Sequence, residues 1–338
     1  MDAIVEQQDA ELKRLVDAAV GYAAEVSPIT YEMARQAPTW RAAYSDRTAA
    51  LMATFCELAY DRFEESIGVT RQVLEAKLAR GRFALVATYD VDATTEGYLA
   101  ASDQFAVLAF RGTQDAADWR VNFNAGLEQL DPARPRIKVH TGFLEAFRSV
   151  EPLIRADLDA KVGPDIGLYI TGHSLGGALA QIASAALERP TLAACYTFGS
   201  PRVGGADFDF EVKCPNYRLV NDWDLVPAVP PPGWRGYHHA GDVRQLTARG
   251  RPPYRGARSP WRFLLRVPWA LIVYAVARRF FLIDDHMIWN YRDKLAVVAR
   301  NRNRGLPKDA TPAASSTTWP YSISAHPREG GDPGVLGR

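Results

Sequence analysis

The chain has 338 residues, of which 47% are hydrophobic and 23% are charged, and its formal net charge is +1. This length and composition allow a sizeable core and exclude a wholly disordered protein. The near-zero net charge excludes a global electrostatic preference for nucleic acid.

Two helical patterns open the chain. Apolar residues recur at helical spacing between Ile4 and Val20, so residues 1–45 are predicted to form a helical extension that acts as a lid or a packing arm. A second helical pattern, Arg47–Glu64, opens the main domain, which is predicted to cover residues 46–303. Residues 68–80 predict a further short helix.

Strand patterns follow these helices. Phe83–Tyr89 and Glu96–Ser102 predict a hairpin-like pair, and Gln104–Phe110 is a continuous apolar run typical of a buried strand. The third strand runs directly into Gly112 and Thr113. Backbone amides above a sheet edge can stabilise a developing oxyanion, so this loop is a candidate for half of an oxyanion hole, with a plain strand exit as the alternative.

The next short amphipathic stretch, residues 118–124, fits a lid over a site and a solvent-facing packing helix equally well. A helix is then predicted over Leu144–Ala160. Further strands are predicted at Gly167–Thr171, Ala193–Phe198 and Tyr217–Asn221. Their alternation with helices predicts an α/β fold, in which a mostly parallel central sheet has helices on both faces.

The most informative stretch is Gly172-His-Ser-Leu-Gly176, which lies between a predicted strand and a small-residue helical pattern over Leu175–Leu187. This context is typical of a nucleophile elbow, which presents a serine on a strained turn. Such a turn requires neighbours almost without side chains two positions away, and Gly172 and Gly176 satisfy that requirement. The pattern predicts that Ser174 is a catalytic nucleophile.

A serine nucleophile needs a histidine base and an orienting carboxylate, and in an α/β-hydrolase these follow it in the order acid, then histidine. Asp224 is favoured as the acid because a turn fixed by Pro227 would hold its carboxylate, whereas Asp222 is predicted to cap the loop. His286, at a loop-to-helix junction near the end of the fold, is favoured as the base, with His239 as its rival.

The three cysteines, Cys56, Cys195 and Cys214, are widely spaced and suit reduced structural thiols better than a disulfide framework or a zinc site. The acidic start of the chain does not resemble a secretory signal. These features predict a cytoplasmic protein.

Residues 245–283 contain eight arginines, interleaved aromatic residues and no acidic residue. Their apolar part, Val267–Ala277, is too short for a membrane span, which needs roughly twenty residues. Two interpretations of this insert stay open: an interfacial helix that contacts anionic head groups, giving peripheral membrane contact, and a cap packed on the domain. No nucleic acid partner is expected. Residues 304–338, rich in Pro, Gly, Ser and Thr, are predicted to be a disordered tail.

Several segments together resemble the class 3 lipase family of α/β-hydrolases, which contains the fungal triacylglycerol lipases. They run in the family's order over roughly residues 45–300 and comprise Phe110–Thr113, Asp118-Trp119, Val139–Phe143, Gly172–Gly177, Thr197–Gly204, Asn221–Pro227 and Asp285–Tyr291. The resemblance implies a triad of Ser174, Asp224 and His286. It also implies an oxyanion hole formed by the amides of Thr113 and Leu175, and it places residues 118–124 at the position of the lid.

The resemblance implies hydrolysis of carboxylic esters in acylglycerol-like lipids through an acyl-enzyme, without a metal or cofactor. It does not carry the substrate range over, because this chain departs from the secreted, disulfide-bonded fungal members and contains the arginine-rich insert. Two alternatives stay open: a phospholipase or lysophospholipase acting at an anionic membrane surface, and a non-catalytic lipase-like interaction domain.

Overall fold

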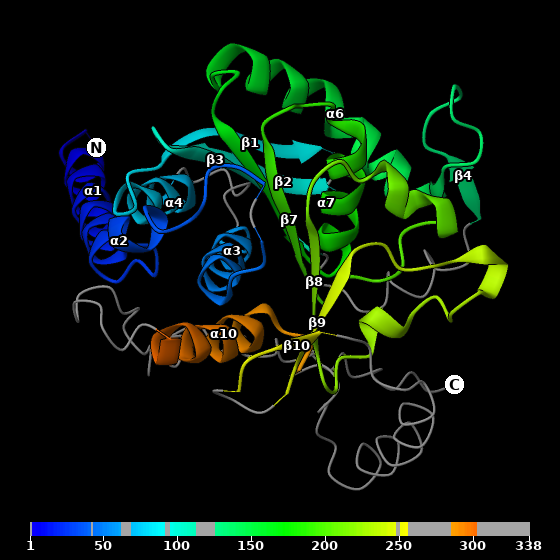
Figure 1. The fold of residues 1–338 in the computed structure, drawn as a ribbon. Coiled ribbons are helices and arrows are strands. Elements are labelled where there is room, and N and C mark those ends of the chain that lie inside the picture. Colours follow the sequence, from blue (N-terminus) through cyan, green and yellow to red (C-terminus); the bar gives the residue numbers. More distant parts are fainter. Residues whose placement is uncertain are drawn as a thin grey trace, which may run out of the picture.

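The structure is a computed structural model that describes residues 2–41, 43–61, 69–91, 95–112, 126–247, 251–255 and 285–302. These residues form an eight-stranded sheet in the order β1-β2-β3-β6-β7-β8-β9-β10, together with a separate two-stranded sheet, β4-β5 (Figure 1). The strands are β1 (Ala84–Val91), β2 (Thr95–Ala101), β3 (Phe105–Phe110), β4 (Leu127–Gln129), β5 (Lys138–His140), β6 (Gly167–His173), β7 (Leu192–Phe198), β8 (Asn216–Asn221), β9 (Asp242–Leu246) and β10 (Tyr254–Arg255).

The large sheet is parallel through its centre, from β3 through β6, β7 and β8 to β9. Antiparallel pairing is confined to its two ends, where β1 and β2 precede β3 and where β10 follows β9. This arrangement confirms the predicted α/β fold with a mostly parallel central sheet.

Helices cover both faces of the sheet. The described helices are α1 (Asp2–Glu25), α2 (Tyr31–Ala34), α3 (Asp46–Leu58), α4 (Val69–Ala79), α6 (Thr141–Lys161), α7 (Leu175–Ala186) and α10 (Ile288–Arg302). Three short 3-10 segments, η1 (Ala206–Glu211), η2 (Val226–Ala228) and η3 (Trp234–Gly236), lie in the loops. Buried residues of α3, α4 and α10 form the core on one face, and those of α6 and α7 form the core on the other (Figure 1).

The central strands are buried along their whole length because helices cover them on both sides. Every residue of β3, β6 and β7 is buried, which explains why their sequences are continuous apolar or small-residue runs without alternation. These strands end at the same edge of the sheet, so the loops that leave β3, β6 and β7 converge there.

Two helix boundaries differ from the sequence-based prediction because polar side chains cap the helices. The Nδ1 atom of His140 accepts a hydrogen bond from the Phe143 amide at 3.4 Å, so α6 begins at Thr141 rather than at Leu144. The Ser45 hydroxyl accepts one from the Thr48 amide, also at 3.4 Å, and α3 begins at Asp46. The helix predicted over Arg47–Glu64 extends too far, because α3 ends at Leu58.

The start of the predicted arginine-rich insert belongs to the sheet instead. Gln245 and Leu246 complete β9, and Tyr254–Arg255 form β10. Both strands lie at one end of the sheet, where β9 is only partly buried and both residues of β10 are exposed, so they lack the continuous apolar run that marks the central strands. The interfacial-helix and cap hypotheses were made for residues 245–283, and most of that insert, residues 256–283, lies outside the described residues, as does the predicted tail at 304–338.

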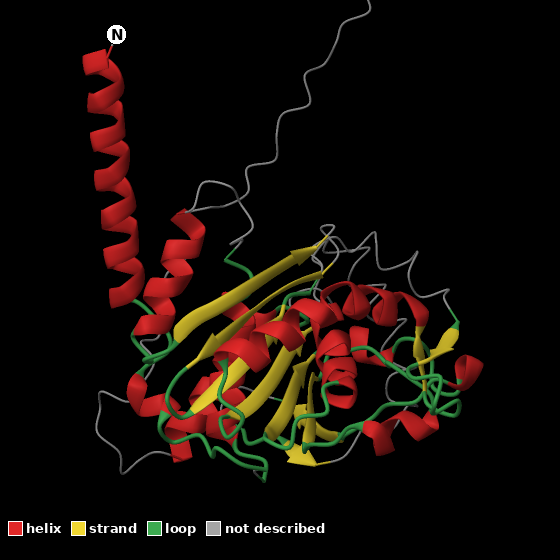
Figure 2. Cartoon of the chain, turned by 90° about the horizontal axis from the view of Figure 1, so that it is seen from above, coloured by secondary structure: helices red, strands yellow, loops and turns green. Residues whose placement is uncertain are grey.

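Helix α1 extends away from the body of the molecule, as Figure 2 shows. Near its C-terminal end Ala23 is buried, whereas Leu15 and Tyr22 are more than half exposed. Within the described ranges, no helix combines the length and the apolar character needed to cross a membrane.

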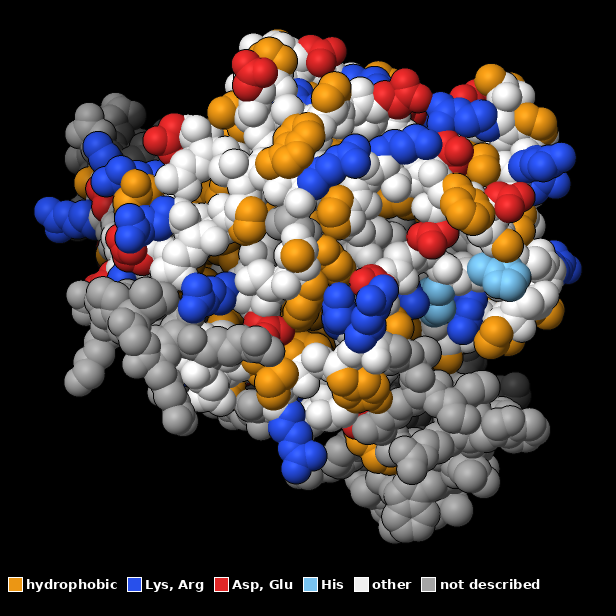
Figure 3. Space-filling view, viewed as in Figure 1, with side chains coloured by type: hydrophobic (Ala, Val, Ile, Leu, Met, Phe, Trp, Pro, Cys, Tyr) orange, Lys and Arg blue, Asp and Glu red, His pale blue; other side chains and the backbone are white. Residues whose placement is uncertain are grey.

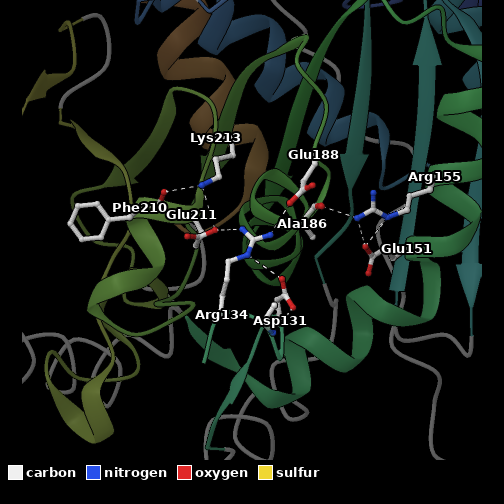
Figure 4. A network of polar contacts seen from close by, with 10 residues as sticks. Asp131, Arg134, Glu151, Arg155, Ala186, Glu188, Phe210, Glu211 and Lys213 are labelled. Carbon is white, nitrogen blue, oxygen red and sulfur yellow. Dashed lines mark hydrogen bonds and ion pairs between the residues drawn. The ribbon is translucent and has the colours of Figure 1, made fainter. Parts of the chain in front are cut away.

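Arg134 ties the loop between β4 and β5 to the rest of the chain (Figure 4). Its guanidinium forms ion pairs with Asp131 at 3.0 Å, with Glu188 at 2.7 Å and with Glu211. The face of the molecule shown in Figure 3 carries charged side chains of both signs, interspersed with apolar ones, in keeping with the near-zero net charge.

Candidate active site

Ser174 connects the buried strand β6 to helix α7 on a strained turn. Its backbone has φ 60° and ψ −127°, a region that residues other than glycine rarely adopt. The Ser174 amide donates to the Phe198 carbonyl at 2.9 Å, and its carbonyl accepts from the Gly177 amide at 3.0 Å. These two hydrogen bonds hold the turn, which has the geometry of a nucleophile elbow.

The glycines on either side of the serine are required because a side chain at either position would clash with neighbouring backbone atoms. A Cβ atom on Gly172 would lie 2.0 Å from the Gly176 carbonyl oxygen. A Cβ atom on Gly176 would lie 2.4 Å from the carbonyl oxygen of Phe110 at the end of β3. The turn therefore packs backbone against backbone, as the Gly-x-Ser-x-Gly pattern predicts.

The structure brings together the three side chains predicted to act as a triad. Ser174 Oγ lies 2.9 Å from His286 Nε2. His286 Nδ1 lies 2.9 Å from Asp224 Oδ2 and 3.0 Å from Oδ1. Because a carboxylate only accepts hydrogen bonds, Nδ1 carries the proton of a neutral His286 ring, and Nε2 is free to accept the Ser174 hydroxyl proton.

Asp224 is buried and held by further donors. The Tyr291 hydroxyl donates to Oδ2 at 2.5 Å, and the Val226 amide donates to Oδ1 at 2.9 Å. The same Tyr291 hydroxyl accepts from the Asn221 amide at 3.0 Å. Burial, followed by the neighbouring Asp224 charge, raises the pKa of Tyr291 well above its usual value, so this hydroxyl keeps its proton.

Asp285 fixes the segment that carries the histidine. Its Oδ2 atom accepts from the Trp223 amide at 3.1 Å, and its carbonyl accepts from the Asn221 side chain at 2.8 Å. These bonds join the acid loop to the residue directly before His286. The sequence included Asp285 and Tyr291 in a family-like motif, but it indicated no role for either side chain.

The two rival candidates lie elsewhere. His239 Nε2 bonds the Pro227 carbonyl at 2.8 Å, and Asp222 Oδ1 accepts from the Gln245 side chain at 3.3 Å. Neither of these contacts involves Ser174 or His286. His239 thus supports the loop that follows Asp224.

Leu175 is the first residue of α7, so its amide belongs to the first turn of the helix, where N–H groups have no intrahelical acceptor. Such amides favour negative charge. The other predicted oxyanion residue, Thr113, lies outside the described residues, as does the predicted lid at 118–124. The loop reaches the site at Gly112, where a Cβ atom would lie 2.9 Å from Ser174 Cβ.

Among the described residues, no group of three or more His, Cys, Asp or Glu side chains is arranged to hold a metal ion. Cys56, Cys195 and Cys214 are free and buried, as predicted for structural thiols.

The parallel sheet, the elbow after its central strand and the Ser–His–Asp contacts together define an α/β-hydrolase fold with a serine hydrolase site. Residues 107–234 match the family described as Lipase (class 3).

Parts of the chain are also similar to individual curated proteins. The chain is 39% identical over 139 residues to a secreted mono- and diacylglycerol lipase from Fusarium solani, covering 39% of this chain and 41% of the relative. It is 30% identical over 154 residues to phospholipase A1 EG1 of Oryza sativa subsp. indica, covering 37% of this chain and 35% of the relative. The matches thus span only 41% and 35% of the length of these two relatives.

Similarity to solved structures extends further along the chain. A triacylglycerol lipase whose catalytic centre is described as a serine protease triad superimposes with a TM-score of 0.54 at 26% sequence identity. That comparison covers 65% of this chain and 87% of the lipase.

Proposed function

We propose that this protein hydrolyses carboxylic ester bonds of acylglycerol-like lipids. The observation that carries the proposal is the unbroken contact series from Ser174 Oγ through His286 to Asp224, with 2.9 Å at each step. A non-catalytic interaction domain has no need of all three groups in this order.

The geometry supports the following reaction. Ser174 Oγ attacks the ester carbonyl carbon while His286 Nε2 takes the hydroxyl proton, and Asp224 stabilises the imidazolium that forms. The amides of Leu175 and Thr113 bind the oxyanion. His286 then returns the proton to the leaving alcohol, and water hydrolyses the acyl-enzyme by the same route to release the acid and regenerate the serine.

Acylglycerols are favoured as substrates because the Fusarium solani relative is named as a mono- and diacylglycerol lipase. A phospholipase is the second candidate, supported by the similarity to the rice phospholipase A1. The two differ in whether the substrate carries a phosphate head group. A mixed lipid extract containing both classes, with the released products identified, separates them.

The test compares the wild-type protein with Ser174→Ala on mono-, di- and triacylglycerols and on phosphatidylcholine and phosphatidylglycerol. We expect Ser174→Ala to lower kcat by about 10⁴-fold or more on whichever lipid is cleaved. Ser184→Ala is the matched control, because Ser184 is a buried serine of α7 whose hydroxyl donates to the Ala180 carbonyl and not to a triad residue. Full activity in Ser174→Ala would refute the proposal, and cleavage of phospholipids alone would favour the second candidate.

We also propose peripheral contact with anionic membranes through the arginine-rich residues 245–283. The support is their composition, which contains eight arginines and interspersed aromatic residues but no acidic residue. Replacing Arg258, Arg262 and Arg266 by Gln should reduce sedimentation with phosphatidylglycerol vesicles. The control replaces Arg71, Arg148 and Arg155, whose side chains are exposed on α4 and α6. Equal pelleting of the two variants would argue against the proposal.

We further propose that the protein acts in the cytoplasm. Its three free, buried thiols support this location, since reducing compartments keep cysteines unpaired. Fractionation of the producing cells tests it, and recovery of the protein chiefly from the medium would contradict it.

A further inference from the structure

His173 is buried beside the triad and has no part in the reaction above. It directly precedes Ser174, its side chain is only 4% exposed, and its ring centroid lies 4.6 Å from that of His286. Both of its ring nitrogens are bonded. Nδ1 lies 2.7 Å from the Tyr60 hydroxyl, and Nε2 lies 2.5 Å from the backbone carbonyl oxygen of His286.

The direction of these hydrogen bonds follows from their end groups. The His286 carbonyl can only accept, so His173 Nε2 must carry a proton. In a neutral ring Nδ1 then has no proton and must accept, so the Tyr60 hydroxyl donates to it. The Tyr60 oxygen is left to accept, and the Gly112 amide donates to it at 3.1 Å. The four groups therefore form one hydrogen-bond chain in which each group donates to the next: the Gly112 amide to Tyr60, Tyr60 to His173, and His173 to the His286 carbonyl.

Burial keeps the two middle groups in these roles. Desolvation, followed by the neighbouring His286, lowers the pKa of His173 well below 6.5, so the ring stays neutral. Desolvation also raises the pKa of Tyr60, so its hydroxyl keeps the proton that it donates.

The two ends of this hydrogen-bond chain lie next to the two groups on which charge develops during the proposed reaction, the oxyanion and the imidazole of His286. Gly112 directly precedes the predicted oxyanion residue Thr113, and His286 is the proposed base. Gly112 is packed closely, because a Cβ atom there would lie 2.6 Å from the Tyr60 hydroxyl and 2.7 Å from the His173 carbonyl oxygen. Next to it, Arg111 forms a largely buried ion pair with Glu96 and lies 5.8 Å from the centre of the Tyr60 ring.

We propose that Tyr60 and His173 are positioning residues whose directed hydrogen-bond chain fixes the oxyanion loop relative to the backbone of His286. This inference rests on the proposed function. When Ser174 attacks, negative charge forms at the loop and positive charge forms on the imidazole, so both partners must already be at the correct separation.

The kinetic test is a double-mutant cycle with Tyr60→Phe and His173→Phe, both of which keep an aromatic ring. We expect each to lower kcat by about 10- to 100-fold while KM changes less than about twofold, because binding is spared and orientation is lost. Because the two side chains act in one chain, the double variant should lose little more than the worse single variant.

Tyr169→Phe is the matched control. It removes another largely buried tyrosine hydroxyl, which donates to the Pro38 carbonyl near the start of β6. It should leave kcat unchanged. Multiplicative losses in the double variant, or unchanged kcat in Tyr60→Phe, would overturn the inference. The inference would also be overturned if Tyr169→Phe lowered kcat as much as Tyr60→Phe does while the two variants had equal thermal stability, since that result indicates a general structural role.

A second measurement does not depend on hydrolysis. In protein labelled with ¹⁵N-histidine, NMR should show His173 as the neutral tautomer protonated at Nε2, with its signals assigned by their loss in His173→Phe. The opposite tautomer would overturn the chain whatever the activity. A wild-type protein that cleaves no ester yet shows the Nε2–H tautomer would contradict the proposed function while supporting the hydrogen-bond chain.

Discussion

Gly199 packs its backbone against the acid–base pair of Asp224 and His286. Its φ is +61°, and a Cβ atom there would lie 2.5 Å from Asp224 Oδ2 and 3.0 Å from His286 Nδ1. Gly199→Ala should therefore push the carboxylate and the imidazole apart and lower kcat by about 10- to 100-fold. Steady-state hydrolysis of a soluble ester measures this effect.

The matched control for that substitution is Gly233→Ala. Gly233 also has a positive φ, +73°, but a Cβ atom there meets nothing within 4 Å. The Gly233→Ala substitution should lower the free energy of unfolding by about 1–2 kcal/mol through backbone strain alone, and it should leave kcat unchanged. Equal kcat values in the two variants would contradict the assigned contacts.

The roles of single residues differ in how well they can be predicted from the sequence. Each triad residue lies next to a feature that can be recognised in the local sequence. Ser174 lies between the elbow glycines, Asp224 follows the end of a strand, and His286 lies at a loop-to-helix junction. Tyr60 has no such signal, because its contact with the Gly112 amide joins positions 52 residues apart. Tyr291 lies within a family-like motif, but its bond to Asp224 spans 67 positions and depends on how α10 packs. Contacts of this kind arise only from the fold.

At the scale of elements, the elbow depends on close packing of the β6–α7 turn against the end of β3. Gly176→Ala would place a methyl group 2.4 Å from the Phe110 carbonyl oxygen and 2.6 Å from that of Arg111. These are backbone atoms that cannot rotate away, so the free energy of unfolding should fall by roughly 3 kcal/mol or more. Denaturant titration followed by circular dichroism measures it.

Gly21→Ala provides the comparison, since Gly21 lies in α1 with nothing within 4 Å of its Cβ position. It should raise stability by about 0.5–1 kcal/mol because alanine favours the helix. Wild-type stability in Gly176→Ala would show that the turn is looser than the structure indicates.

Elements with strong patterns were predicted, and weakly patterned ones were not. The buried runs of β3, β6 and β7 and the small-residue helix α7 were placed to within a few residues. Strands β9 and β10 were missed because they lie at the end of the sheet, where β9 is only partly buried and β10 is exposed, so their sequences contain polar residues and show no apolar run. Composition alone had assigned Gln245 and Leu246 to the arginine-rich insert.

For the molecule as a whole, two histidines with depressed pKa values link stability to pH. Burial lowers the pKa of His173 and of His239 well below 6.5, and the charges of Arg218 and Arg202 lower that of His239 further. Both rings are neutral in the folded state, whereas the unfolded chain binds protons below pH 6.5. The contribution of these two histidines to the free energy of unfolding is therefore fully present above pH 6.5, and it is lost as the pH falls below 6.5.

Each histidine should weaken folding by up to about 1.4 kcal/mol per pH unit below 6.5. His239→Gln keeps a donor for the Pro227 carbonyl but cannot titrate. Its free energy of unfolding should fall less between pH 7.5 and 5.5 than that of the wild-type protein, and all other groups cancel in this comparison. Identical pH profiles for the two proteins would contradict the assignment.

The central claim is that His286, held by Asp224, makes Ser174 a nucleophile. The most direct measurement is covalent labelling with a fluorophosphonate probe, followed by mass spectrometry of the labelled peptide. We expect a single adduct on Ser174 in the wild-type protein, much slower labelling in His286→Asn and Asp224→Asn, and none at this position in Ser174→Ala. Ester hydrolysis by a wild-type protein that carries no adduct on Ser174, or labelling at an unchanged rate in His286→Asn, would contradict it.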